Sequence, residues 1–364
     1  MNDYLNRLLE LTIQIQQIPA PTFSEEERGK FVRALFNNEG LADISTDKVG
    51  NVFGRLRGDG DAAPLIICAH LDTVFPAEKS LRVTRRSERV AGPGIGDNSL
   101  GIAGMIGLLW LLRERDIRLA GDVWLVATVG EEGLGNLRGM RAVADRFEDA
   151  PFAYLILEGL ALGHIYHRAL GIRRYRICAH TQGGHSWGHY GRPSAVHELS
   201  ALIAKLTGLN LPEKPRTTLN VGTISGGTSI NTIAADACLN LDLRSEDTGA
   251  LTALVRDVEK IVETANKPRV RVEAEEIGRR PSGEIPASHP LVKLAEESLR
   301  QQDIDPVLTI GSTDASIPLS RGYTAVCIGL TTGDGAHTVD EFIYTHPLEQ
   351  GMEQLLSFVE NLWG

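Results

Sequence analysis

The chain lacks several features that mark large classes of protein. Its 364 residues include only four cysteines, and none has the CxxC or CxxH spacing of a metal site. Each lies alone in a strand-like run, which predicts buried free thiols in a reducing cytoplasm: Cys68, Cys178, Cys238 and Cys327. The longest apolar run, 101–112, is too short to span a bilayer. The start of the chain has no basic segment of a signal peptide, so we expect a cytoplasmic protein without membrane contact.

Basic residues are also scarce. Lysine and arginine number 37 against 47 aspartates and glutamates, which gives a formal net charge of −10. This excess of acid argues against nucleic acid and anionic membranes as partners. A hydrophobic fraction of 42% and a charged fraction of 23% are ordinary for a globular protein. The length exceeds what a single hydrophobic core usually covers, so we expect two domains.

Apolar runs alternate with helical patterns in the first part of the chain. Four runs resemble buried strands: 65–68, 123–126, 154–157 and 324–328. Continuous apolar strands are typical of parallel or mixed sheets that are covered on both faces. The segment 99–113 is apolar nearly all round, which indicates a helix buried against such a sheet. Ser24 and Glu27 have the spacing of a capping box at the start of another helix. We therefore expect a layered α/β domain.

The pattern changes near Gly171. From there the order is strand, helix, strand, strand, helix and strand, which predicts a ferredoxin-like α+β module. We expect this inserted module to span 172–282. The α/β domain is then discontinuous, with its two parts at 1–171 and 283–364.

Acidic residues and histidines cluster at five points, and four of these follow the strand-like runs. The residues are His70 and Asp72, Asp97, the pair Glu131 and Glu132, Glu158, and His337. In open α/β sheets, ligands bind in the crevice beyond the carboxyl ends of the strands. Residues far apart in sequence would converge there and offer two imidazoles and several carboxylates. The sequence therefore predicts a metal site, with two metals rather than one.

The residue types fit distinct roles in such a site. His70 and Asp72 are two residues apart at a strand end, so the carboxylate is placed to orient a metal-binding imidazole. Asp97 lies in a glycine-rich turn, where its two oxygens can bridge two metals. Glu131 and Glu132 are neighbours and cannot point the same way. One can bind metal while the other acts as general base on the attacking water.

The ligand chemistry favours zinc. Three carboxylates, from Asp97, Glu132 and Glu158, offset much of the charge of two divalent ions, and without metal they would repel one another. Histidine and carboxylate ligands without thiolate suit Zn²⁺ first, with Co²⁺ or Mn²⁺ as substitutes.

Eight motifs spread over almost the whole chain make a family resemblance specific. They are AHLDTV (69–74), GIGDNSLGIAG (94–104), GEEGLGNLRG (130–139), LEG (157–159), GGHS (183–186), NTIAADACLNLDLR (231–244), GSTDA (311–315) and GAHTVDE (335–341). In content and order they resemble the M20 family of zinc metallopeptidases and deacylases. This family includes carboxypeptidase G2, peptidase T, acetylornithine deacetylase and succinyl-diaminopimelate desuccinylase.

The resemblance implies a role for each clustered residue. One zinc ion would be bound by His70, Asp97 and Glu158, and the other by Asp97, Glu132 and His337. Glu131 would be the general base, and Asp72 would orient His70. The family has a cis peptide after the bridging aspartate and often a second aspartate there. This chain departs from that pattern with Asn98.

The resemblance also implies roles in the inserted module. His185 would stabilise the oxyanion of the tetrahedral intermediate, while Asn231 and Arg244 would bind the carboxylate side of the substrate. The alternative for Arg244 is a solvated residue at a strand end. In many relatives an edge of this module pairs with its twin. We therefore expect a homodimer through 172–282, with the module closing as a lid and His185 acting on the partner's site.

The expected reaction is amide hydrolysis. In this family, glutamate at the position of Glu158 is typical of carboxypeptidases and deacylases, whereas aminopeptidases and dipeptidases tend to have aspartate. A carboxypeptidase-like exopeptidase acting on short peptides is therefore the first expectation. An N-acyl-amino-acid deacylase and a di- or tripeptide aminopeptidase like peptidase T remain alternatives.

Three rival interpretations are weaker. The sequence GHSWG (184–188) matches the GxSxG elbow of serine hydrolases, but that elbow needs a helix that starts at the serine, and Gly188, Gly191 and Pro193 oppose one. A chelator would stop a metal enzyme, and a serine-directed phosphonate would stop the rival. The glycine-rich turn 92–101 lacks the GK[ST] ending of a phosphate-binding loop. A non-catalytic binding module would be expected to have lost ligands or the base, and none is missing.

Overall fold

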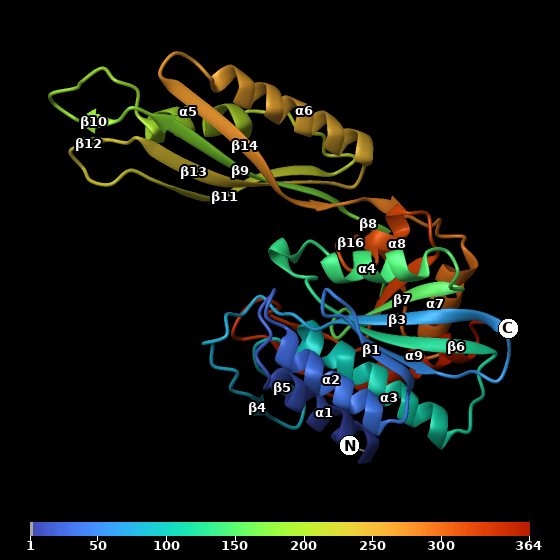
Figure 1. Ribbon diagram of the computed structural model, residues 1–364. Coiled ribbons are helices and arrows are strands. Elements are labelled where there is room, and N and C mark those ends of the chain that lie inside the picture. Colours follow the sequence, from blue (N-terminus) through green and yellow to red (C-terminus); the bar gives the residue numbers. More distant parts are fainter. Residues whose placement is uncertain (1–2) are drawn as a thin grey trace. The chain divides into compact units, whose positions relative to one another are not determined.

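The computed structural model describes residues 3–364 and divides into two compact units. The first unit consists of the chain up to Ala169 together with Gly283–Gly364, and the second is Leu170–Ser282 (Figure 1). The sequence predicts the crossings at 171/172 and 282/283. In the structure they lie at 169/170 and 282/283. The first unit is therefore built from both ends of the chain.

A mixed sheet forms the centre of the first unit. Among the described residues it has nine strands, in the order β1 (Ala42–Thr46), β2 (Val52–Leu56), β6 (Gly121–Thr128), β3 (Ala62–His70), β7 (Ala153–Glu158), β17 (Ala325–Gly329), β8 (His164–Ala169) and β15 (Gly283–Glu284), with β16 (Val307–Gly311) also on β8. The central strands β6, β3, β7 and β17 run parallel. Their apolar runs are fully buried, as continuous apolar strands require.

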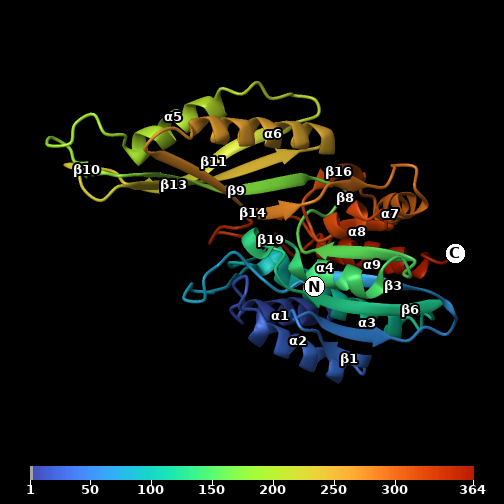
Figure 2. The same ribbon diagram turned by 45° about the horizontal axis from the view of Figure 1, so that its top comes forward.

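Helices cover both faces of this sheet. They are α1 (Asp3–Gln16), α2 (Glu26–Asn38), α3 (Gly101–Glu114), α4 (Arg138–Phe147), α7 (Pro290–Arg300), α8 (Ser316–Ser320) and α9 (Leu348–Glu360). Figures 1 and 2 show α1 and α3 on one face and α4 and α8 on the other. The predicted layered α/β domain is confirmed.

The helix predicted at 99–113 is longer than its apolar run. The segment η1 (Ile95–Leu100) directly precedes α3, although Asp97 and Asn98 in it have non-helical φ and ψ angles. Counted together, Ile95–Glu114 is long and apolar enough to cross a membrane by length and composition alone. However, 89% of it is buried inside the protein, as in the core helix of a layered domain.

A second, small sheet joins two distant segments of the first unit. Its order is β18 (Gly333–Asp334), β19 (Phe342–Tyr344), β5 (Arg89–Ala91) and β4 (Thr84–Arg85). Phe342 lies opposite Ala91 in the antiparallel pair β19/β5. This pairing brings the glycine-rich turn that follows β5 next to the segment that contains His337. The sequence gives no signal for these short strands.

The second unit has its own sheet and core. The strands β9 (Gly171–Thr181), β11 (Thr217–Gly226), β13 (Asp236–Ser245) and β14 (Val270–Arg280) form an antiparallel sheet in the order β11-β13-β9-β14. Helices α5 (Ala195–Thr207) and α6 (Thr248–Ala265) cover one face of it (Figure 2). The chain order β-α-β-β-α-β is the predicted ferredoxin-like arrangement. A separate short pair, β10 (Gly184–His185) and β12 (Thr232–Ile233), extends from this sheet.

The prediction of four free thiols is wrong for two cysteines. Cys178 and Cys238 form a disulfide because they lie directly opposite each other on the adjacent strands β9 and β13. Cys68 and Cys327 are buried and free. The pairing depends on strand register, which cysteine spacing alone does not reveal. Because disulfides persist mainly in oxidising compartments, the cysteines no longer support a cytoplasmic location.

Candidate active site

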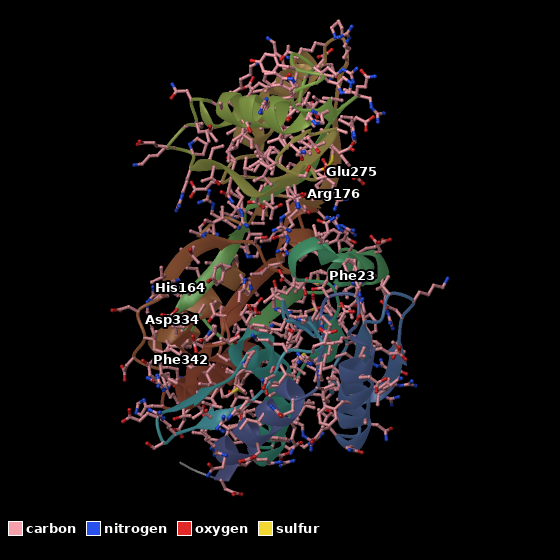
Figure 3. All side chains as sticks on the ribbon, turned by 90° about the vertical axis from the view of Figure 1, so that its left-hand side faces the viewer. Phe23, His164, Arg176, Glu275, Asp334 and Phe342 are labelled. Carbon is pink, nitrogen blue, oxygen red and sulfur yellow. A yellow bond between two sulfur atoms is a disulfide. The ribbon has the colours of Figure 1, made fainter. Side chains whose placement is uncertain are left out.

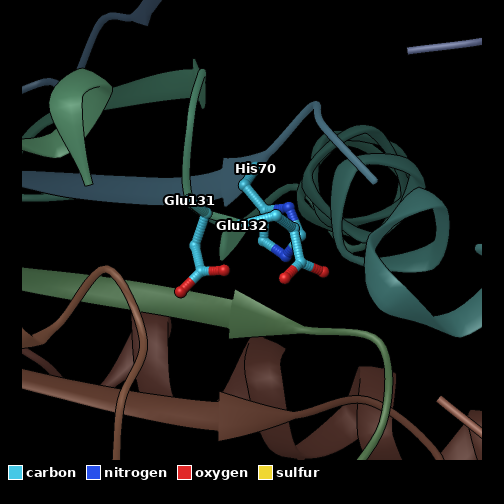
Figure 4. Close-up of side chains that lie close together, drawn as sticks. All are labelled: His70, Glu131 and Glu132. Atoms are coloured by element: carbon cyan, nitrogen blue, oxygen red, sulfur yellow. The ribbon is translucent and has the colours of Figure 1, made fainter. Parts of the chain in front are cut away.

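The carboxyl ends of the parallel strands bring the predicted metal ligands together. His70 is the last residue of β3 and Glu158 is the last residue of β7, and these two strands pair in parallel. Glu131 and Glu132 follow β6, the other neighbour of β3 (Figure 4). Their ligand atoms form three groups, each within 4.8 Å: His70 with Glu131 and Glu132, His70 with Asp97 and Glu158, and Asp97 with Glu132 and His337.

Asp97 lies between the two histidines. Its Oδ1 is 3.0 Å from Nε2 of His70, and its Oδ2 is 3.1 Å from Nε2 of His337. Glu132 Oε1 is also 3.1 Å from His337 Nε2, and Glu158 Oε2 is 3.7 Å from His70 Nε2. Each oxygen of one carboxylate therefore faces a separate group of donors. This is the geometry that a bridging aspartate between two cations requires.

Asn98, the residue after Asp97, bonds to the backbone at the end of β7. The Asp97–Asn98 peptide is cis, as the resemblance leads one to expect. Asn98 is buried; its Nδ2 donates to the carbonyl of Leu157 (2.8 Å), and its Oδ1 accepts from the amide of Gly159 (2.9 Å). These two bonds flank Glu158. An ionised aspartate has no N–H and could not donate the bond to Leu157, so the amide of Asn98 makes a contact that the more common aspartate cannot make.

Asp72 holds the two glutamates as well as approaching His70. Its Oδ1 accepts from the amide of Glu131 and its Oδ2 from the amide of Glu132, both at 2.9 Å. His70 Nδ1 lies 2.9 Å from the Asp72 carbonyl and 3.7 Å from Oδ1. A carbonyl can only accept, so Nδ1 carries the proton and Nε2 is left to bind a metal. The orienting contact therefore comes from the backbone of Asp72, and its carboxylate anchors the Glu131–Glu132 loop.

Glu25 supports the same loop from α2, and the sequence patterns do not reveal it. Its Oε1 accepts from the amide of Gly130 at 3.1 Å, and Arg138 contacts both of its oxygens at 2.9 Å. Burial is the largest influence on this group and raises the pKa of Glu25. The loop that carries Glu131 and Glu132 is thus held by two buried carboxylates, those of Glu25 and Asp72.

The electrostatics of the cluster favour cations. Burial opposes charge on His70, but the carboxylates of Asp97 and Glu158 raise its pKa well above the usual range. Hydrogen bonds to Asp97 and Glu132 raise the pKa of His337 to about 10. The two histidines hold the pKa of Asp97 below its usual range against the effect of burial. Burial raises the pKa of Glu158 to about 7. The cluster therefore stabilises positive charge near both imidazoles.

The donor set fits divalent metals. Imidazole nitrogens and carboxylate oxygens converge, and neither Cys68 nor Cys327 belongs to any metal-binding group among residues 3–364. Mixed nitrogen and oxygen donors of this kind suit Zn²⁺, Co²⁺ or Mn²⁺. A thiolate-preferring site is not present in the described part of the chain.

His185 lies in the second unit, and two backbone amides set the tautomer of its ring. Its Nδ1 accepts from the amides of Trp187 (3.2 Å) and Gly188 (3.3 Å), so Nε2 carries the proton of the neutral ring. The amide of His185 donates to Nδ1 of His189 at 3.0 Å. The sequence gives His189 no role, whereas the structure shows that it holds the backbone of His185. An exposed ring with Nε2–H is suited to donate a hydrogen bond to an anionic oxygen.

The second unit separates the remaining predicted residues. Asn231 accepts through its carbonyl from the amide of Ser186 at 2.9 Å, so it lies beside His185. Arg244 lies near the other end of β13, opposite Ile172 at the first crossing. Eight residues of strand separate Asp236 from Arg244, a distance of roughly 25 Å. The structure therefore brings Asn231 to His185 and keeps Arg244 apart from both.

Arg244 is held rather than freely solvated. Its Nε donates to Oδ2 of Asp242 at 2.6 Å, and Arg174 donates to Oδ1 of the same carboxylate at 2.9 Å. These arginines lower the pKa of Asp242 although burial opposes them. The contact through Nε holds the guanidinium beside Asp242.

The serine-hydrolase interpretation does not fit the local structure. A nucleophile elbow needs a helix that begins at the serine. Here α5 begins at Ala195, nine residues after Ser186, and a turn lies between them.

Comparisons with known proteins show the family of this chain. A family model described as peptidase family M20/M25/M40 matches residues 66–361. Succinyl-diaminopimelate desuccinylase of Corynebacterium glutamicum is 24% identical, over 93% of this chain and 92% of that protein. A tripeptidase from Staphylococcus aureus shares the fold, with a TM-score of 0.83, 23% identity and 98% of each chain covered. The YXEP protein of Bacillus subtilis, a dinuclear metal-binding M20 peptidase, has a TM-score of 0.70 and 18% identity, with 98% of this chain and 97% of that chain covered. The chain is a hydrolase that belongs to peptidase family M20/M25/M40.

Proposed function

We propose that this protein is a dinuclear zinc exopeptidase of the carboxypeptidase type, which releases an amino acid from a short peptide. The observation that carries the proposal is the position of Asp97, whose two oxygens face His70 and His337 separately. One ion would be held by His70, Asp97 and Glu158, and the other by Asp97, Glu132 and His337. When bound, such ions polarise an amide carbonyl and lower the pKa of an attacking water.

Glu131 supplies the proton transfers. It is buried beside His70 and Glu132, and its amide is fixed by Asp72. Its carboxylate removes a proton from the water as the new C–O bond forms. It then gives that proton to the amide nitrogen as the C–N bond breaks, so that the amine leaves neutral. This sequence needs no other acid or base.

His185 stabilises the oxyanion through its Nε2–H. Arg244 binds the free carboxylate of the substrate through its terminal nitrogens. Asn231, which lies beside His185, also binds the carboxylate side of the substrate. One short substrate cannot meet His185 and Arg244 of the same second unit, because two residues of peptide span at most about 7 Å and these side chains are far more widely separated. The separation supports a composite site, in which Arg244 acts in its own chain and the partner's lid supplies its histidine.

A homodimer provides that composite site. The strand β11 forms one edge of the second unit's sheet, and Ile224 on it is exposed. An exposed edge strand with apolar side chains needs covering, and a two-fold copy of the same edge covers it. We therefore propose dimerisation through the second unit, with lid closure placing the partner's histidine over the substrate.

The type of amide can be decided by a substrate panel. Dipeptides, tripeptides and N-acyl amino acids are incubated with the zinc-loaded protein, and release of free amine is followed. Cleavage of peptides that carry a blocked N-terminus and a free carboxylate supports the proposal. Preference for acyl amino acids favours a deacylase, which the desuccinylase relative suggests. A requirement for a free N-terminus favours an aminopeptidase, which the tripeptidase neighbour suggests. No amine release from any substrate contradicts amide hydrolysis.

Substitution of Arg244 by alanine should lower kcat/KM about 10- to 100-fold on substrates with a free carboxylate, because one hydrogen-bonded charge pair is lost. Amidation of the substrate should cause a loss of the same size. Both changes remove the same interaction, so the two losses should not add. Steady-state kinetics of both proteins on both substrates measures this.

Arg176→Ala is the matched control. Arg176 projects from the same sheet, lies near Glu275 on the neighbouring strand (Figure 3), and is similarly exposed, 49% against 41% for Arg244. It should leave kcat/KM unchanged. Equal cleavage of amidated and free substrates by the native enzyme would show that no carboxylate is recognised.

A further inference from the structure

Glu341 makes an unusual set of contacts beside the metal site. Its carboxylate is completely buried, at 0% exposure. Oε2 accepts from the amide of Gly94 at 2.8 Å, and Oε1 accepts from the amides of Gly96 (2.7 Å) and Asp97 (2.8 Å). Its backbone carbonyl accepts from the amide of Gly92 at 2.8 Å. One residue thus anchors most of the turn that carries the bridging aspartate.

The two segments that Glu341 connects each supply a ligand to the same metal position. His337 lies four residues before Glu341, in the segment that leads into β19. Asp97 lies in the turn that follows β5, and β5 pairs with β19. The strand pair aligns the segments, and the carboxylate of Glu341 fixes the distance between their ends. Among the described residues, the carboxylate of Glu341 is the acceptor for the amide of Asp97.

The backbone of the turn is shaped to admit this carboxylate. Gly94 has a φ of +71°, which disfavours residues with a side chain. A Cβ on Gly96 would lie 2.7 Å from the side chain of Leu160, so any larger residue would force that side chain to shift. A buried carboxylate is costly unless several donors surround it, and three amides of this turn provide them. The glycines therefore allow the backbone conformation in which three amides of the turn point at the carboxylate of Glu341.

Glu341 does not serve as a metal ligand. It belongs to none of the metal-binding groups in the described chain, and both of its oxygens already accept amide hydrogens. Its arrangement resembles that of Asp72, which anchors the amides of Glu131 and Glu132 in the same way.

We propose that Glu341 is a positioning residue that sets the spacing of Asp97 and His337 and thereby the affinity for the second metal ion. This inference rests on the proposed function. The affinity of the first metal position should depend less on Glu341, because His70 and Glu158 end strands of the central sheet. The second position depends on two loop residues that meet through Glu341.

The test is Glu341→Gln. The amide has the shape of the acid but presents NH₂ to a backbone N–H, which breaks one anchor. Loss of a group that orients metal ligands typically costs 10- to 100-fold in metal affinity. We therefore expect Zn²⁺ titration of the metal-free protein to show one ion of native affinity and one bound about 10- to 100-fold more weakly. Turnover should recover when excess Zn²⁺ is supplied. Glu341→Asp keeps the charge but has a shorter side chain. Its affinity for the second ion should lie between those of Glu341→Gln and the native protein.

Glu296→Gln is the matched control. Glu296 is also buried, at 7% exposure, but pairs with Lys293 and Arg300 on α7. It should bind both ions like the native protein. Two ions of native affinity in Glu341→Gln would overturn the inference. So would equal loss of both ions with a lowered Tm of the metal-free protein, because that result indicates a purely structural role. If the native protein itself binds fewer than two ions, the proposed function fails instead.

Discussion

Replacement of Glu131 by glutamine should lower kcat by about two to four orders of magnitude, the usual contribution of a general base, while both metal ions remain bound. Glutamine keeps the size of the side chain and the amide that Asp72 holds. It cannot accept a proton from water at neutral pH. Elemental analysis of the purified variant and single-substrate kinetics measure the two quantities separately.

The neighbouring residue gives a sharp control. Glu132 belongs to the group with Asp97 and His337, so Glu132→Gln should weaken the second metal ion and recover activity when metal is added in excess. Glu131→Gln should not recover at any metal concentration. Near-native turnover by Glu131→Gln, or loss of both ions from it, would contradict the assignment of the base.

Removal of the His185 ring in His185→Ala should reduce kcat about 100- to 1,000-fold, the cost of one lost oxyanion donor. Mixing this variant with Glu131→Gln should restore activity if the histidine acts on the partner's site. After complete exchange, half of the dimers are mixed and each holds one intact site, so about a quarter of native activity should return. Size-exclusion chromatography with differently tagged chains confirms the exchange.

A second mixture tests whether Arg244 acts in the same chain as Glu131 or on the partner's site. Glu131 and Arg244 should act in the same chain, so mixing Glu131→Gln with Arg244→Ala should restore nothing beyond the sum of the two variants. His197→Ala is a control for the lid, because this exposed histidine makes none of the contacts of His185. Absence of recovery in the first mixture after confirmed exchange would mean that His185 acts in its own chain or not at all.

The sequence was sufficient to predict the parallel strands β6, β3, β7 and β17 at the centre of the sheet and the residues that the metal groups contain. His70 and Glu158 follow apolar runs, and parallel strands necessarily bring their carboxyl ends to one edge. A bridging role for Asp97 could be expected from its place in a glycine-rich turn, but the contacts of its two oxygens depend on how that turn folds. Local patterns therefore located the residues but did not define their contacts.

The features that the sequence did not reveal are contacts between distant segments. Glu341 bonds to amides about 245 positions earlier in the chain, and no periodic pattern marks such a pair. Cys178 and Cys238 meet through strand register. The Ser24–Glu27 capping box is also wrong: α2 begins at Glu26 after Glu25, without a side-chain cap. Glu25 instead bonds to Gly130, so an acid at a helix start serves the active site.

The interrupted first unit has a consequence for the order of events during synthesis. The strand β17 lies between β7 and β8 in the sheet, yet it leaves the ribosome more than 150 residues after them. The inserted unit contains its complete sheet and core, so it can fold first, as domains do when they emerge. Until residues 325–344 emerge, β7 lacks one of its two neighbouring strands and the proposed second metal position lacks its histidine. The group of Asp97, Glu132 and His337 can therefore form only after nearly the whole chain has been released.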